Sequence, residues 1–179
     1  ARGFVESMGK GPLEAVYVTI FYHGDFREAV SKMSRWHRLF EAHPERIGHG
    51  RTAADVILAQ QSQRTAVFFG FQNCSPIESD IDLVEVCHQL GARFMQLSYN
   101  NQSLLASGCY EEVDSGITRM GRQVIAEMNR VGLVVDMSHS GERSTLEAIE
   151  VSASPLAIKH CNPHSWHSTM LHKFSKVLL

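Results

Sequence analysis

The sequence contains no long hydrophobic run and no cluster of basic residues. A helix needs about 20 consecutive apolar residues to cross a bilayer, and no stretch of the chain approaches that length. Acidic and basic residues are mixed along the chain, with a formal net charge of −2, so no basic surface of the kind that binds nucleic acid is expected. We therefore expect neither a membrane segment nor a nucleic-acid partner.

Cysteine is also sparse, and the chain has no C-x-x-C pair. A chain of 179 residues is too large to depend on disulfides, and free cysteines are usually buried. Residues 1–10 lack the apolar segment of a signal peptide. We therefore expect a chain without a membrane segment in the reducing cytoplasm, with buried thiols at Cys74, Cys87, Cys109 and Cys161.

The sequence does contain a regular alternation of short apolar runs and amphipathic helical patterns. With 44% hydrophobic residues, the chain is long enough for one domain with its own core. The alternation is typical of βαβ units with a parallel sheet. Strands are expected at 15–22, 66–71, 94–99, 133–137 and 156–159, and helices from the cap Asp25 towards Pro44 and at 53–63, 81–90, 116–131 and 142–151.

Five strand–helix units are fewer than the eight of a closed TIM-type barrel, which usually needs about 250 residues. The expected fold is therefore α/β, with residues 1–179 forming a single incomplete domain, either an open sheet or a partial (β/α)8 barrel. Open sheet edges invite association, so a chain of this length by itself is expected to be poorly soluble or oligomeric.

Polar side chains stand at the carboxyl ends of the expected strands, where parallel α/β folds collect their functional groups. His139 and His160 follow consecutive strands, so their imidazoles are expected side by side at one rim, and neutral imidazole suits zinc or a similar ion. Asp136 precedes His139 in the same strand, where a helix-facing cap, a salt bridge or a role in orienting a metal-bound imidazole fits it. His164 and His167 are expected at the surface. Other residues at strand ends are His23, Gln72, Asn73, Tyr99, Asn100, Asn101, Ser138 and Cys161.

Four segments around these residues resemble consecutive blocks of the renal or membrane dipeptidase family of zinc metallopeptidases. The resemblance extends from about Ala15 to about Trp166. It implies a (β/α)8 barrel with two zinc ions at the carboxyl rim, bridged by a glutamate. It also implies cleavage of dipeptides, including some with a D-residue at the carboxyl side, and homodimers in several members. The segments are GFQNCSPIE (70–78), FMQLSYNNQSLLASGCY (94–110), GRQVIAEMNRVGLVVDMSHSGERSTLEAI (121–149) and PLAIKHCNP (155–163).

The resemblance also implies roles for individual residues. By position, His139 and His160 match the histidines that bind the second zinc, and Gln72 stands in the place of the bridging glutamate. Tyr99 stands where many members have a histidine that contacts the substrate, so it is expected to be catalytic and substrate-binding, with Asn100 beside it as a second substrate-binding residue. A neutral amide at Gln72 lacks the negative charge that a carboxylate supplies between two cations, so one or two zinc ions are expected.

No match for the family's His-x-Asp pair on the opening strand, or for its aspartate on the last strand, is found in the chain. We therefore expect an internal fragment of the barrel that lacks the first strand and the C-terminal part. Three functions stay open at this point: a metal-dependent dipeptidase, an inactive barrel that serves as a binding or scaffold module, and an amidohydrolase that acts on another small amide. The barrel alone does not decide between them.

Overall fold

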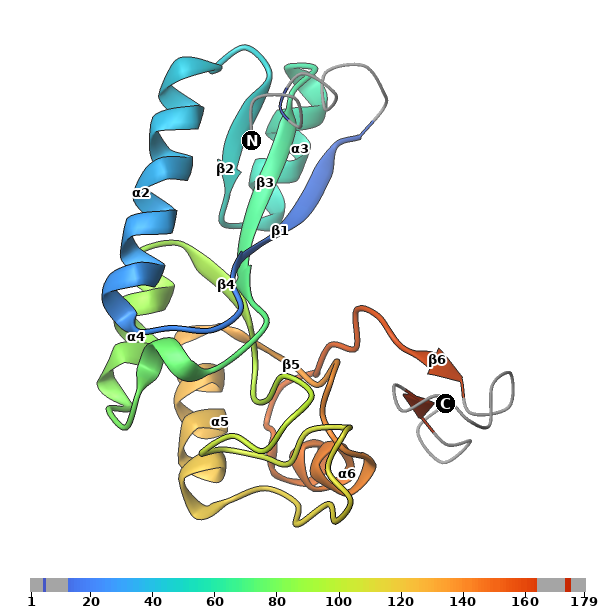
Figure 1. Ribbon diagram of the computed structural model, residues 1–179. Helices are drawn as coiled ribbons and strands as arrows, with labels where there is room; N and C mark the ends of the chain where they lie inside the picture. Colours follow the sequence, from blue (N-terminus) through green and yellow to red (C-terminus); the bar gives the residue numbers. More distant parts are fainter. Residues whose placement is uncertain (1–4, 6–12, 164–172, 175–179) are drawn as a thin grey trace.

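The computed structural model describes Val5, residues 13–163 and residues 173–174. Strands and helices alternate along the chain (Figure 1). The strands are β1 (Ala15–Phe21), β2 (Ile47–Gly50), β3 (Thr65–Phe71), β4 (Ala92–Gln96), β5 (Val134–Asp136), β6 (Asn162–Pro163) and β7 (Lys173–Phe174). The helices are α2 (Phe26–Ala42), α3 (Ala53–Gln61), α4 (Asp82–Gln89), α5 (Arg119–Val131) and α6 (Glu142–Val151), and a short 3-10 helix, η1, spans Ser75–Ile77.

The main sheet is parallel throughout, with the strand order β1-β3-β4-β5 and with β2 also paired to β3. Beyond β5, a parallel bridge joins Asp136 to Ala157. The N–H of Ala157 donates to the Val135 carbonyl at 2.8 Å, and the Met137 N–H donates to the Ala157 carbonyl at 2.8 Å. The predicted parallel arrangement in chain order is therefore confirmed from β3 to Ala157.

The expected strand at 156–159 is wrong in its extent, because only the bridge at Ala157 forms there. Pro155 has no N–H to donate to a neighbouring strand. The backbone N–H groups of Lys159 and His160 donate to the Ser138 side-chain oxygen, at 2.9 and 3.3 Å, and not to strand carbonyls. The ladder therefore ends after one pair.

Strand β2 was missed by the sequence pattern. Its four residues, Ile-Gly-His-Gly, include two glycines, which are weak strand formers, and show no apolar alternation. The strand forms because Ile47 to Gly50 pair with Thr65 to Phe68 of β3. Strand β4 also differs from the expected 94–99, since it begins at Ala92 and ends at Gln96.

The expected helices all form, and side chains near their first turns explain where most of them begin. Asp25 accepts the Glu28 N–H at 2.8 Å and caps α2. Thr52 and Asp55 form a reciprocal capping box at the start of α3. Thr118 caps α5, so this helix begins later than the expected residue 116. Short polar side chains at these positions satisfy N–H groups that have no partner within the helix.

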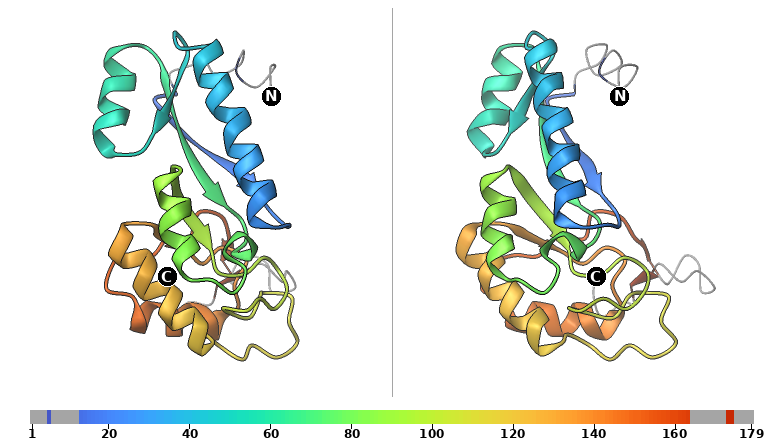
Figure 2. Two further views of the ribbon diagram at one scale, coloured as in Figure 1. Left: turned by 90° about the vertical axis from the view of Figure 1, so that its left-hand side faces the viewer. Right: turned by 60° about the vertical axis from the view of Figure 1, so that its left-hand side comes forward.

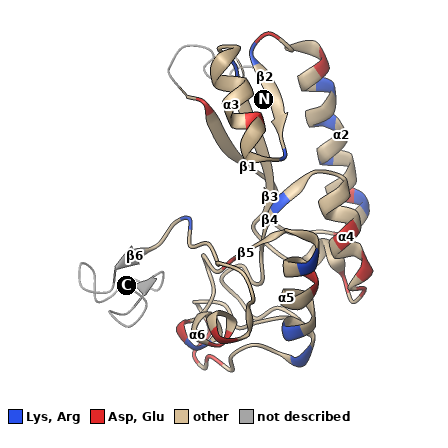
Figure 3. Ribbon diagram, turned by 180° about the vertical axis from the view of Figure 1, so that it is seen from behind, with Lys and Arg blue, Asp and Glu red and all other residues tan. Residues whose placement is uncertain are grey.

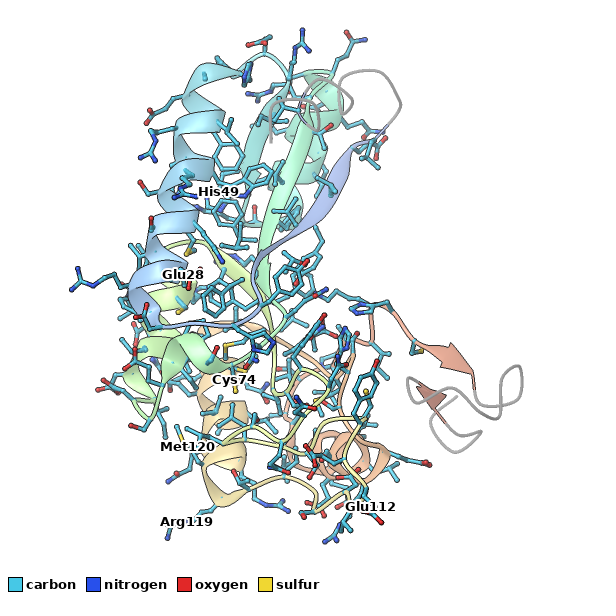
Figure 4. The ribbon with its side chains drawn as sticks, in the orientation of Figure 1. Glu28, His49, Cys74, Glu112, Arg119 and Met120 are labelled. Atoms are coloured by element: carbon cyan, nitrogen blue, oxygen red, sulfur yellow. The ribbon has the colours of Figure 1, made fainter. Side chains whose placement is uncertain are left out.

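The core lies between the strands and the helices α2, α4 and α5, which lie on one side of the sheet (Figures 1 and 2). Strand β3 is buried along almost its whole length, as expected of a central parallel strand. Beneath α2, the ring of His49 packs against those of Phe69 and His37, with 4.3 Å and 5.1 Å between ring centroids (Figure 4). Burial lowers the pKa of His49 to about 4, so this imidazole is neutral at pH 7.

All four cysteines are free thiols, as expected. Cys74 and Cys87 are buried, and burial raises their pKa values to about 11 and about 12. Cys109 and Cys161 are half-buried, so the expectation of full burial is correct for two of the four. Thiols with raised pKa values stay protonated at neutral pH and are poor nucleophiles.

Charged side chains of both signs occur on α2 and α6 (Figure 3), with basic residues in the majority on α2 and acidic residues in the majority on α6. On α2, Lys32 and Glu28 form an ion pair of 2.9 Å one turn apart. Among the described residues, no helix combines the length and the apolar character that a membrane span requires.

Candidate metal centre and substrate cavity

Two histidines meet at the carboxyl rim of the sheet. His139 follows β5, and His160 follows the bridge at Ala157 on the neighbouring segment. Their Nε2 atoms lie 2.7 Å apart, and their ring centroids are 4.7 Å apart. The sequence predicted that adjacent parallel strands would bring these imidazoles together, and the structure has them in contact.

His139 is held in one orientation by Asn100. The Nδ1 atom of His139 lies 2.7 Å from Oδ1 of Asn100, an oxygen that can only accept a hydrogen bond. Nδ1 therefore carries the proton, and Nε2 is left with a lone pair that points to His160. Both residues have positive φ angles, 73° at His139 and 63° at Asn100, a backbone conformation that costs about 1–3 kcal/mol per non-glycine residue and concentrates at functional sites.

His160 is positioned through its backbone. Its N–H and that of Lys159 donate to Oγ of Ser138, and the Ser138 hydroxyl donates to Oδ1 of Asp136 at 2.7 Å. Ser138 thus ties the segment that carries His160 to the end of β5. The sequence placed Ser138 at a strand end but gave no sign of this role, because the contact depends on a loop 21 residues further along the chain.

Beneath the histidines, Asp136 forms a buried ion pair with Lys159. The Lys159 Nζ atom lies 2.8 Å from Oδ2 of Asp136, and Gln96 donates to the same oxygen at 3.0 Å. The ammonium also lies over the Tyr17 ring, 3.1 Å from its centroid. Burial lowers the pKa of Lys159, while Asp136 opposes that shift. Of the roles considered for Asp136, the structure shows the salt bridge.

The donor set is of the kind that zinc prefers, since both groups are imidazoles. Two nitrogens bound at about 2.0–2.1 Å to a tetrahedral zinc ion lie about 3.3 Å apart, so the two Nε2 atoms, which lie 2.7 Å apart at hydrogen-bond distance, would have to separate slightly to bind one ion. Within the described part of the chain, no group of three or more His, Cys, Asp or Glu side chains could hold a metal. His164 and His167 lie outside the described residues. Among the described residues, the candidate centre therefore offers two imidazoles, which alone do not complete a metal site.

Gln72 stands two strands away on the same rim. It follows Phe71 at the end of β3, its backbone N–H donates to the Phe21 carbonyl at 2.9 Å, and its side chain is half-buried. Tyr99 lies nearer to the histidines, with its ring centroid 4.3 Å from that of His139. The structure therefore brings Tyr99 and Asn100 into contact with His139. It places Gln72 at the same rim, at the carboxyl ends of the strands.

A cavity of about 630 Å³ opens beside Tyr99, between the loops that follow β1, β3 and β4. Cys74 in its wall is labelled in Figure 4. The His23 ring lies 5.4 Å from the Tyr99 ring, and Nδ1 of His23 is 3.1 Å from Nδ2 of Asn73. The Asn73 Oδ1 atom accepts the Ser75 N–H at 3.0 Å. Tyr99 thus both lines the cavity and contacts His139.

Comparison with known families identifies the group of proteins that share this arrangement. The model of the membrane dipeptidase family, peptidase family M19, matches residues 5–170. The chain belongs to this family of metallopeptidases. Among curated relatives, Dipeptidase tcpJ of Claviceps purpurea (strain 20.1) is 25% identical over 146 residues, which cover 80% of this chain and 34% of that protein. Rat Dipeptidase 3 is 25% identical over 141 residues, which cover 75% of this chain and 28% of that protein.

Solved structures show the same fold. An amidohydrolase from Pseudomonas aeruginosa has a TM-score of 0.93 at 34% identity, covering 97% of this chain and 53% of the other. A metallopeptidase from Rhodobacter sphaeroides, liganded with a phosphinate mimic of the dipeptide L-Ala-D-Ala, has a TM-score of 0.77 at 20% identity, covering 95% and 50%. The chain is therefore part of an α/β barrel of this type. It spans about a third of the length of the curated relatives and about half that of the solved structures.

Proposed function

We propose that the protein is a metal-dependent dipeptidase whose metal centre includes His139 and His160. The observation that carries this proposal is the 2.7 Å approach of the two Nε2 atoms at the carboxyl rim. Neutral imidazole is a preferred ligand of zinc, and zinc is the proposed metal.

The residues around the histidines support this reading. Asn100 holds the Nδ1 proton of His139, so Nε2 is the atom left to bind a metal. His139 and His160 would hold the zinc ion, which would supply polarisation of a carbonyl group and a lowered pKa for bound water. Tyr99, packed against His139, is the proposed catalytic and substrate-binding residue, since its hydroxyl can donate a hydrogen bond to a substrate oxygen. Asn100 is proposed to assist in binding the substrate.

Gln72 limits the number of metals that we propose. An amide carries no charge, so it cannot offset the repulsion between two adjacent cations as a carboxylate does. We propose one strongly bound zinc ion, with a second bound weakly if at all. Gln72 stands in the place of the family's bridging glutamate, and this difference favours the second candidate function, an inactive barrel that serves as a binding module.

The proposed substrates are dipeptides, including some with a D-residue at the carboxyl side. Support comes from the family and from the relative that binds a mimic of L-Ala-D-Ala. An amidohydrolase acting on another small amide is the remaining alternative, since one similar structure is described as an amidohydrolase. A homodimer and a cytoplasmic location are also proposed, the latter because the cysteines are free thiols.

The experiment combines metal analysis with hydrolysis of L-Ala-L-Ala and L-Ala-D-Ala by the intact protein. We expect zinc to copurify and at least one of the two peptides to be cleaved. His139→Asn should lower both zinc content and activity, whereas His43→Asn, at the far end of α2, should change neither. Zinc binding without cleavage of any dipeptide would favour the binding module, and equal zinc content in both variants would refute the metal centre.

A further inference from the structure

Two residues of the candidate metal centre, Asn100 and His139, have left-handed backbone conformations although neither is a glycine. They lie on different loops, one after β4 and one after β5. A strained backbone of this kind persists only where the surrounding structure enforces it. One short segment, residues 107–110, contacts both of them, and we call it the clamp turn.

The clamp turn binds the backbone of both residues. The Cys109 N–H donates to the His139 carbonyl at 2.9 Å, and the Tyr110 N–H donates to the Asn100 carbonyl at 2.8 Å. The Cys109 thiol also donates, at 3.7 Å, to Oδ1 of Asn100. This is the oxygen that accepts the Nδ1 proton of His139. The clamp turn therefore holds both carbonyls and the side-chain oxygen that joins the two residues.

The clamp turn is itself anchored to the start of α6. Gly108 forms an antiparallel bridge with Ser140, and the Gly141 N–H donates to the Ser107 carbonyl at 3.0 Å. The Ser107 N–H donates to Oγ of Ser144 at 3.2 Å. Ser107 and Ser144 are both fully buried. The clamp turn is thus fixed to the segment that directly follows His139.

Gly108 is the residue that permits the clamp turn to come this close. It is buried, and a Cβ atom at this position would overlap the carbonyl carbon and oxygen of Asn100. Its φ angle lies outside the left-handed region, so contact and not backbone strain disfavours a larger residue. Because the obstacle is backbone and not the end of a flexible side chain, an added methyl group would displace Asn100.

We propose that Gly108 is a positioning residue for the candidate metal centre. Its lack of a side chain lets the clamp turn hold Asn100 and His139 so that Nε2 of His139 is directed to the metal. The inference rests on the proposed metal centre and adds to it a residue that acts only through Asn100. If Asn100 is displaced, the proton of the imidazole is no longer confined to Nδ1, and part of the affinity for zinc is lost.

The experiment measures the zinc affinity of the intact protein by competition with a chelator, for wild type, Gly108→Ala and Gly48→Ala. Gly48, in β2, is the matched control because a Cβ atom there meets no other atom within 4 Å. We expect Gly108→Ala to lower the affinity about tenfold or more and Gly48→Ala to leave it unchanged. Equal affinity in Gly108→Ala and wild type would overturn the proposal and leave the metal centre intact. A wild-type protein that binds no zinc would refute the metal centre and the proposal with it.

A double substitution separates positioning from general support of the fold. If Gly108 acts through Asn100, adding Gly108→Ala to Asn100→Ala should change zinc affinity by less than about twofold. A tenfold loss in both backgrounds would overturn the proposal. In the zinc-free protein, the ¹⁵N resonances of the His139 ring should report one tautomer in wild type and a mixture in Gly108→Ala.

Ser144→Ala keeps the proposal testable if Gly108→Ala does not fold. It removes the acceptor of the Ser107 N–H without adding bulk, so it loosens the anchor of the clamp turn. We expect zinc affinity to fall about threefold and the His139 tautomers to mix. Ser152→Ala, which removes a hydrogen bond to Asn129 at the other end of α6, should change neither. A folded Ser144→Ala with wild-type affinity and a single His139 tautomer would overturn the proposal.

Discussion

Replacing Lys159 with methionine should destabilise the protein, because the substitution leaves the Asp136 carboxylate buried without its cation. The two side chains are 19% and 0% exposed, and their charged atoms lie 2.8 Å apart. Removing one partner of a buried ion pair costs about 3–5 kcal/mol. Gln96 and Ser138 continue to donate hydrogen bonds to Asp136, so we expect a loss at the lower end, about 3 kcal/mol.

The assay is urea-induced unfolding of the intact protein, followed by circular dichroism, in a double-mutant cycle with Asp136→Asn. The double substitution removes both charges, so it should cost less than the sum of the two single substitutions. Lys32→Met, which breaks an exposed pair with Glu28 on α2, should cost less than about 0.5 kcal/mol. A loss below about 1 kcal/mol for Lys159→Met, or strictly additive effects in the cycle, would refute the assignment of a buried ion pair.

Three further predictions concern the pH dependence of stability, the contribution of Asn100 to zinc affinity, and the effect of Gln72 on the zinc content. Because the pKa of His49 is lowered to about 4 in the folded state, the unfolded state binds more protons between pH 6.5 and 4. Stability should therefore fall as the pH drops through this range, and His49→Phe should flatten a plot of unfolding free energy against pH. Asn100→Ala should weaken zinc affinity by about 10- to 100-fold, measured by competition with a chelator, while Asn101→Ala should leave it unchanged. Gln72→Glu should raise the zinc content per chain, and equal content in both proteins would contradict the role proposed for the amide.

The parallel order of the main strands could be predicted from the sequence, because continuous apolar runs and capped helices leave few other arrangements. Asp25 and Thr52 cap helices as their residue types predict. The contact between His139 and His160 followed from the same reasoning, since neighbouring parallel strands end at one rim.

Other features depend on contacts that local sequence does not encode. The glycine-rich strand β2 exists only because β3 offers it a partner. The partnership of Lys159 with Asp136 joins strand β5 to the segment that follows the bridge at Ala157, and the two residues are far apart in the sequence. The cavity beside Tyr99 is formed by three loops, so the position of Glu78 in its wall has no local signal. Tertiary packing, and not propensity, decides each of these cases.

The most direct test of the metal centre is a crystal structure of the intact protein grown with zinc, with diffraction data collected on both sides of the zinc absorption edge. We predict an anomalous peak within about 2.0–2.1 Å of Nε2 of both His139 and His160, with Nδ1 of His139 still bonded to Asn100. A zinc-loaded protein whose anomalous peak lies elsewhere, with the two imidazoles uncoordinated, would contradict the account.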